Sequence, residues 1–204
     1  DTVIRMHEEM NTRGRADAER AEQLARLHRE VGTCTACGLH ESRTHAVPGE
    51  GPATAELLLV GEGPGAEEDA TGRPFCGRSG RVLDETLEEA GLERASLYIT
   101  SVVKCRPPGN RNPRRAEARV CCRRWLDRQI ELVDPDLAML LGKVAAKAIL
   151  GVDEKLKDVH GEIRSRYGRR YMLSYHPAAA LRFPDVAERS RLDFRRAGEL
   201  LRQA

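Results

Sequence analysis

Glu56-Leu-Leu-Leu-Val-Gly-Glu-Gly-Pro-Gly65 indicates a buried β-strand that runs into a tight, glycine-rich turn. Three further apolar runs predict strands: Leu97-Tyr-Ile-Thr-Ser-Val-Val103, Asp136-Leu-Ala-Met-Leu-Leu141 and Tyr171–Ser174. Helical patterns separate these runs, and strands that alternate with helices favour a parallel sheet covered on both faces. We therefore expect an α/β fold of three layers, αβα, around a central, mostly parallel four-stranded sheet.

The helices are predicted from apolar residues at helical spacing. Ala16 to Val31 is expected to form an amphipathic helix, preceded by a frayed segment, residues 1–15. A chain of 204 residues is long enough for one α/β domain with an extension. We expect an N-terminal extension over residues 1–33 and a single domain over residues 34–204. Within that domain the expected helices are Ser79–Ala90, Glu117–Val133, Lys143–Leu150 and Val186–Leu201.

The cysteines suggest a metal or cluster site whose ligands come from two segments that lie far apart in the sequence. Cys34 and Cys37 form a C-x2-C pair, and Cys105 and Cys122 follow much later in the chain. Four thiolates complete either a tetrahedral zinc site or an iron–sulfur cluster, and the spacing does not choose between them. In the alternative interpretation these cysteines are small buried hydrophobic residues. On an ideal helix Cys122 shares the inward face, which leaves Cys121 and Cys76 as spare cysteines.

Three segments at strand ends are expected to converge on one edge of the sheet: 61–65, 101–104 and 175–182. Ligands bind outside the carboxyl ends of the strands in such open sheets. The turn at 61–65 exposes backbone amides and is followed by acids that can orient or activate water. Phe75 offers a ring for stacking on a planar base, and His176 a hydrogen bond for a developing negative charge. In the alternative interpretation the three features are a plain turn, a core residue and a structural histidine.

Charge is unevenly distributed along the chain. The net charge is only +2, but residues 104–124 contain eight lysines and arginines against one acid. Such a segment fits a surface that faces phosphates. No apolar run approaches the roughly 18 residues that span a bilayer, and Asp1 to Met10 is too charged for a signal peptide. We expect a cytoplasmic protein without membrane association, in which reduced cysteines act as ligands.

Taken together, these segments resemble the iron–sulfur uracil-DNA glycosylases known as family 4. The resemblance runs from about Cys34 to the C-terminus, in family order and at family-like spacing. The matching residues are Cys34-x2-Cys37, Gly61-Glu-Gly-Pro-Gly-Ala-Glu-Glu-Asp69, Gly72-Arg-Pro-Phe75, Val102-Val-Lys-Cys-Arg-Pro-Pro-Gly-Asn-Arg111, Cys122 and His176-Pro-Ala-Ala-Ala-Leu-Arg182.

The resemblance implies a [4Fe–4S] cluster on Cys34, Cys37, Cys105 and Cys122. Cys122 is preferred to Cys121 because Cys122-Arg-Arg-Trp-Leu126 fits the family's cysteine-led helix. The cluster's role is expected to be structural, since cleavage of an N-glycosidic bond needs no redox chemistry.

A role for each pocket residue also follows from the resemblance. The enzyme flips a base out of DNA, and Phe75 stacks on the flipped uracil. Backbone near Glu62 and Gly63 contacts the uracil, and Glu62 counts among the catalytic residues. Glu68 assists the water that attacks the sugar carbon. His176 stabilises the charge that develops on uracil O2 as the bond breaks.

The resemblance further implies that uracil-containing DNA, single- or double-stranded, is the substrate, and that an abasic site is the product. Leu181 is the expected wedge in the duplex. Arg182 and Arg111 are expected to hold phosphates. We expect a monomer because one pocket is sufficient.

Ser101 is the one marked departure from the family pattern, which has asparagine there. A serine hydroxyl cannot reproduce the amide's paired donor and acceptor, although a water can bridge the gap. A second hypothesis is therefore an iron–sulfur DNA-binding protein with weak or altered base excision. A third is a zinc-stabilised nucleotide-binding domain.

Overall fold

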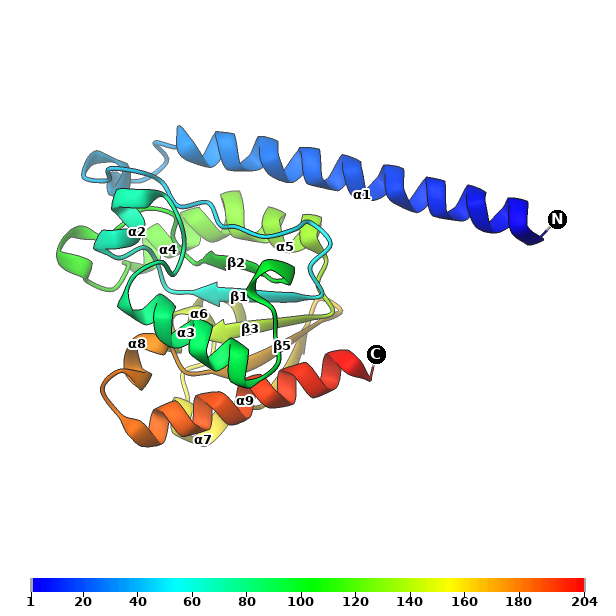
Figure 1. Cartoon of the computed structure of the whole chain (residues 1–204). Helices are drawn as coiled ribbons and strands as arrows, with labels where there is room; N and C mark the ends of the chain where they lie inside the picture. The colour runs from blue at the N-terminus through cyan, green and yellow to red at the C-terminus, as the bar shows by residue number, and fades with distance from the viewer. Residues whose placement is uncertain (1, 204) are drawn as a thin grey trace.

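The computed structural model describes residues 2–203, with side chains from residue 14 onward. A five-stranded sheet in the order β2-β1-β3-β5-β4 forms its centre (Figure 1). Its strands are β1 (Leu57–Gly61), β2 (Tyr98–Ser101), β3 (Leu137–Leu141), β4 (Ile163–Arg166) and β5 (Arg169–Ser174). β2, β1, β3 and β5 pair in parallel, so their carboxyl ends meet at one edge.

The prediction of four strands was wrong by one. β4 pairs antiparallel to β5 at the edge of the sheet, and the two form a hairpin with Tyr167 and Gly168 at its turn. Both turn residues have positive φ, 51° and 76°. Ile163-Arg-Ser-Arg166 lacks an apolar run because an edge strand that is only partly covered does not need one. The expected three layers and the mostly parallel sheet are confirmed.

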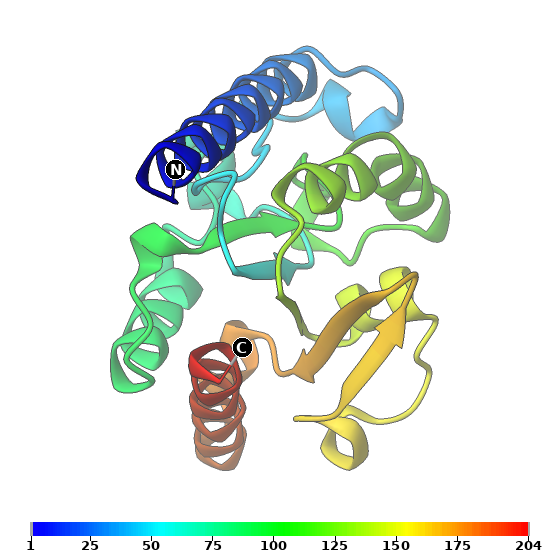
Figure 2. The same ribbon diagram turned by 90° about the vertical axis from the view of Figure 1, so that its right-hand side faces the viewer.

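Alternate side chains of the strands build two separate cores. Leu58 and Val60 of β1 belong to a core on the face covered by α1 (Thr2–Gly32), α5 (Asp127–Val133) and α6 (Lys143–Leu150). Leu57 and Leu59 point the other way, into a core with α3 (Arg78–Glu89) and α9 (Pro184–Arg202). Figure 2 shows these two helical layers on opposite sides of the sheet.

The first helix is longer than expected. Helix α1 begins at Thr2, so the expectation of a frayed segment over residues 1–15 was wrong for residues 2–15; residue 1 lies outside the described residues. Leu24, Leu27 and Val31 are at most 4% exposed and anchor its C-terminal half beside α5. In Figure 1 the N-terminal half continues past the body of the domain.

The expected helix Glu117–Val133 contains a defect that changes which side chains face inward. It consists of α4 (Arg115–Cys121), the π-helical turn η4 (Cys122–Leu126) and α5. In this turn the Asp127 N–H donates to the carbonyl of Cys122, five residues back, so one extra residue is accommodated. The phase of the helix shifts at this point, and Cys121 is buried while Cys122 is only partly covered.

The remaining elements are short. They are η1 (Gly38–Glu41), α2 (Ala66–Thr71), η2 (Arg94–Ser96), η3 (Pro108–Asn110), α7 (Leu156–Val159) and α8 (Pro177–Ala180). None of the helices in the described part of the chain is both long enough and apolar enough to cross a membrane.

Candidate active site

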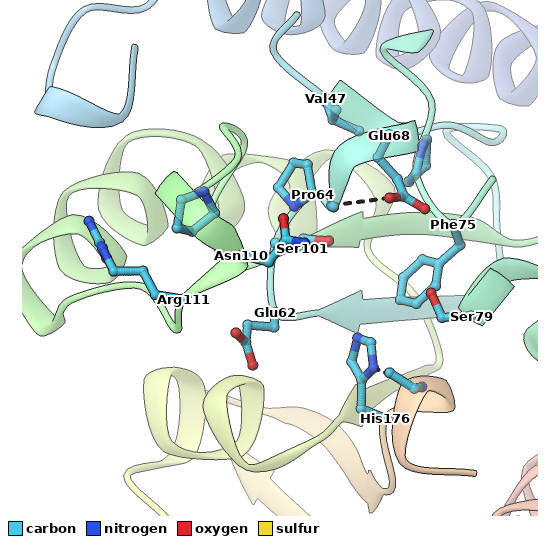
Figure 3. Close-up of a pocket in the computed structure, with 15 residues that line it drawn as sticks. Val47, Glu62, Pro64, Glu68, Phe75, Ser79, Ser101, Asn110, Arg111 and His176 are labelled. Atoms are coloured by element: carbon cyan, nitrogen blue, oxygen red, sulfur yellow. Dashed lines mark hydrogen bonds between the residues drawn. The ribbon is translucent and has the colours of Figure 1, made fainter. Parts of the chain in front are cut away.

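A cavity of about 270 Å³ opens at the carboxyl ends of β1 and β2. The three strand-end segments predicted from the sequence all contribute to it, and Figure 3 shows Glu62, Ser101 and His176 from these segments around it. Its walls are Val47, Glu62, Gly63, Pro64, Gly65, Glu68, Pro74, Phe75, Ser79, Ser101, Pro107, Asn110, Arg111, His176 and Ala178.

Glycines in the first turn allow the walls to approach closely. Gly61 lies opposite Ser101 in the parallel pairing of β1 and β2. A Cβ on Gly61 would lie only 2.7 Å from Phe75 Cζ, and one on Gly63 only 2.6 Å from Val103 Cγ2. The absence of side chains at these two positions lets the aromatic ring and the next strand end pack against the turn.

Phe75 is held in an unusual backbone conformation. Its φ is 47°, a region that costs a residue with a Cβ about 1–2 kcal/mol. Arg94 stabilises the conformation by donating to the carbonyls of Phe75 (3.3 Å) and Pro74 (2.8 Å) while it pairs with Glu50 at 2.8 Å. Gly80 of α3 packs on the same segment, since a Cβ there would lie 1.9 Å from the Phe75 carbonyl oxygen. Strain of this kind is commonly stored at functional sites.

His176 faces the Phe75 ring as a neutral imidazole. It directly precedes α8, and its Nδ1 accepts the Ala178 N–H at 3.1 Å. Because Nδ1 is the acceptor, the ring proton is assigned to Nε2, which is then a donor. Burial lowers the pKa of His176 from 6.5 to about 4, against the opposing effect of the Glu68 charge. The ring centroids of Phe75 and His176 are 5.5 Å apart.

Two carboxylates in the cavity wall have different surroundings. Glu68 accepts three backbone N–H bonds at 3.1 Å, from Gly65, Cys76 and Gly77, so it ties the glycine-rich turn to the segment after Phe75. For Glu62, by contrast, burial raises the pKa of the carboxyl. Glu68 is therefore fixed by the backbone, and the raised pKa of Glu62 is one property that a general base needs.

Ser101 lies at the end of β2 with its side chain on the cavity wall, 7% exposed. Its backbone carbonyl accepts a hydrogen bond of 2.6 Å from Lys104 Nζ, which also donates to Thr100 Oγ1 at 2.6 Å. Burial lowers the pKa of Lys104 to about 8, while the nearby thiols of Cys121, Cys122 and Cys105 raise it. Lys104 thus fixes the strand end that presents Ser101.

The turn at 181–183 follows the cavity residue Ala178, and this rim carries exposed apolar side chains of which the sequence predicted only Leu181. Leu181 and Phe183 are 50% and 54% exposed, on the turn between α8 and α9. Arg182 lies between them and is also exposed. Phe183 was not among the predicted site residues, although its place beside Leu181 in a chain with only three phenylalanines was a usable signal.

Arg111 is engaged within the protein. Its guanidinium forms two hydrogen bonds to Glu117, at 2.7 and 2.9 Å, and this pairing raises the pKa of Arg111. It lines the cavity on the side away from Phe75 (Figure 3). A phosphate would have to compete with Glu117 for this group.

A second, much smaller cavity brings cysteines together. Cys34, Cys37, Cys105 and Cys121 all line it, and Cys122 does not. Three N–H donors point at two of the sulfurs: Trp125 Nε1 to Cys34 at 3.3 Å, Ala36 N to Cys34 at 3.5 Å and Arg43 Nη1 to Cys105 at 3.2 Å. Across residues 14–203, no three Cys, His, Asp or Glu side chains are spaced as ligands of one metal ion.

The family model and the relatives that are at least 30% identical point to one superfamily. Residues 48–201 match the model of the uracil DNA glycosylase superfamily. A type-4 uracil-DNA glycosylase of Archaeoglobus fulgidus is 40% identical over 187 residues, which cover 88% of this chain and 94% of that protein. A second, from Pyrobaculum aerophilum, is 43% identical and covers 79% of this chain and 86% of its own length. A type-5 uracil-DNA glycosylase of the same organism is 33% identical, covering 78% of this chain and 74% of that protein.

Proposed function

The chain belongs to the uracil DNA glycosylase superfamily, and we propose that it is a uracil-DNA glycosylase that hydrolyses the N-glycosidic bond of a flipped uracil and leaves an abasic site. One observation supports the proposal most strongly. A strained Phe75, a neutral His176 with a free Nε2–H and a buried carboxylate share one cavity at the edge of the sheet.

Recognition of the base combines stacking with hydrogen bonds. The Phe75 ring stacks on the uracil, a contact worth about 1–3 kcal/mol in single-strand binding. The Ser101 hydroxyl and the backbone of Glu62 and Gly63 bond the edge of the base. Because serine supplies one hydroxyl where an amide would supply two groups, a bridging water completes the contact.

Bond cleavage needs a group that stabilises the departing base and a group that acts on water. His176 donates from Nε2 to uracil O2, where negative charge develops, and a neutral imidazole can supply this hydrogen bond. Glu62, whose carboxyl pKa is raised by burial, takes a proton from the attacking water. Glu68 holds the turn in place and offers its fixed carboxylate as a second acceptor for that water.

Duplex DNA is held at the rim. Leu181 and Phe183 insert at the gap left by the flipped nucleotide, and Arg182 binds an adjacent phosphate. Arg111 approaches a phosphate only when its pairing with Glu117 loosens.

The second cavity is proposed to hold a [4Fe–4S] cluster on Cys34, Cys37, Cys105 and Cys121. The donor set fits, because N–H groups aimed at sulfurs are a feature of thiolate-bound clusters. The buried ammonium of Lys104, whose two hydrogen-bond acceptors are both uncharged, also favours an anionic group beside it. When bound, the cluster joins the N-terminal segment to the loop after β2. Cys121 replaces the sequence-based choice of Cys122 because only Cys121 lies on the cavity wall.

The test is a cleavage assay on labelled single- and double-stranded DNA with one uracil, with alkali to break abasic sites. The unmodified chain is expected to cut, and Ser101→Asn to cut with altered efficiency. If only Ser101→Asn cuts, the chain has changed its preferred base. If neither cuts although both hold iron and bind DNA, the proposal fails and the DNA-binding hypothesis replaces it.

A further inference from the structure

We propose that Asp193, on the C-terminal helix α9, is a positioning residue for His176, an inference that rests on the role proposed above for His176. Asp193 does not line the cavity, and its side-chain hydrogen bonds among the described residues join it to Ser174 and His160, neither of which lines the cavity. It acts instead through the end of β5, the strand from which His176 emerges.

Asp193 is a buried carboxylate that joins two other segments. It is 4% exposed and accepts a hydrogen bond of 2.7 Å from Ser174 Oγ at the end of β5. Its Oδ1 lies 3.0 Å from Nδ1 of His160. Burial of a carboxylate costs free energy that these hydrogen bonds must offset. An apolar side chain would fill the same space without that cost, so the hydrogen bonds of Asp193 matter beyond its packing. The carboxylate therefore contacts the chain at Ser174, two residues before His176.

The turn before β4, which contains Gly161, is built around the same carboxylate. Gly161 has a φ of 74°, and a Cβ there would lie 2.9 Å from Asp193 Oδ1. Arg196, one turn further along α9, donates to the Gly161 carbonyl at 2.8 Å. The Gly161 N–H in turn donates to Leu173 of β5 at 2.7 Å. Helix α9 therefore holds both this turn and the strand end.

Further contacts hold the two residues that directly precede His176. The carbonyl of Ser174 accepts the N–H of Gly142 at 2.9 Å, which ties β5 to β3. The Tyr175 ring packs on the imidazole of His160, the histidine beside Asp193, with ring centroids 5.2 Å apart. A Cβ on Gly142 would lie 3.0 Å from His176 Cβ. The two residues before His176 are thus fixed, and with them the direction in which its ring enters the cavity.

The expected consequence is a loss of rate with little loss of binding. A displacement of about 1 Å in a catalytic group can cost roughly 100-fold in rate. We expect Asp193→Ala to slow single-turnover release of uracil by about 10- to 100-fold. The KM for DNA should stay nearly constant, because Asp193 is buried away from the rim.

A double-mutant cycle separates positioning from general support of the fold. Single-turnover rates at 25 °C are compared for Asp193→Ala, His176→Ala and the double variant. If Asp193 acts through His176, Asp193→Ala slows the unmodified chain and has no further effect in the His176→Ala background. Equal slowing in both backgrounds would overturn the proposal. Glu199→Gln, which removes an exposed carboxylate from the same helix, is the matched control.

A second measurement does not depend on the catalytic activity of the protein. NMR of ¹⁵N-histidine-labelled protein reports which ring nitrogen of His176 carries the proton. The unmodified chain should show the Nε2–H form, and Asp193→Ala a mixture of the two tautomers. Ser174→Ala, which deletes only the hydroxyl, takes its place if Asp193→Ala does not fold. An unchanged His176 signal in a folded variant refutes the proposal. If the unmodified chain releases no uracil, the proposed function fails, while the NMR comparison still decides the role of Asp193.

Discussion

Replacement of Phe75 by leucine should remove base stacking and leave the fold intact. Phe75 is 7% exposed, and its ring lies against Gly61 and faces His176. Leucine keeps a branched apolar side chain, so the lost volume should cost less stability than the roughly 3–5 kcal/mol of a Phe→Ala truncation. Both residues carry a Cβ, and the strain of the positive φ therefore cancels in the comparison.

The expected loss of catalysis follows from the stacking energy. About 1–3 kcal/mol of base–aromatic contact is removed, and each 1.36 kcal/mol is tenfold in kcat/KM. Phe75→Leu should therefore lower kcat/KM by roughly 5- to 160-fold. Single-stranded DNA with one uracil is the appropriate substrate, since no base pair has to be opened.

Phe194→Leu is the control for stability alone. Phe194 is fully buried in the core between the sheet and α9, away from the cavity. It should lower Tm at least as much as Phe75→Leu and leave kcat/KM within about twofold. A Phe75→Leu variant that retains the full kcat/KM would refute the stacking role, and with it the assignment of this cavity to the base.

Three further outcomes are expected. NMR titration should give His176 a midpoint of about 4 instead of 6.5. Between pH 4 and 6.5 the folded state then binds fewer protons than the unfolded state, so the free energy of unfolding should fall as the pH drops through this range. An NMR midpoint near 6.5 would contradict the buried, neutral imidazole. Cys121→Ser should lose iron and visible absorbance while Cys122→Ser keeps both, and the reverse result would restore Cys122 as the ligand. Leu181→Ala and Phe183→Ala should slow excision from duplex DNA at least about tenfold more than from single strands, and equal slowing would exclude a wedge.

Strong local patterns made much of the fold predictable. The run Leu57-Leu-Leu-Val60 is buried on both faces of the sheet, so its apolar signal was continuous. Helix α6 has the predicted bounds, Lys143–Leu150, because Gly142 and Gly151 delimit it. β4 gave no such signal, since its side chains are half-buried or exposed at the edge.

The choice between Cys121 and Cys122 shows where periodicity fails. An ideal helix places Cys122 on the inward face with Leu126 and Ile130. The π-helical turn adds one residue between Cys122 and Asp127, so positions before it rotate and Cys121 turns inward. No pattern of apolar residues in the sequence predicts a π-helical turn.

Several residues that line the cavity were predictable from the sequence, but the contacts that support them were not. The glycines and His176 were singled out because they follow predicted strands, and Phe75 because its ring can stack on a base. Arg94 and Asp193 were not, because a side chain that acts from a distant element has no local motif. Glu68 was identified for catalysis, and its three backbone bonds add a structural role that the sequence did not suggest.

The most direct test of the central claim is the quantity of free base released. Iron-loaded chain is incubated with a single-stranded oligonucleotide that carries one uracil, and uracil and abasic sites are both counted by mass spectrometry. The account predicts one free uracil for each abasic site over many turnovers, with His176→Ala slowed strongly. No free uracil from a folded, iron-loaded chain that still binds the oligonucleotide would contradict it.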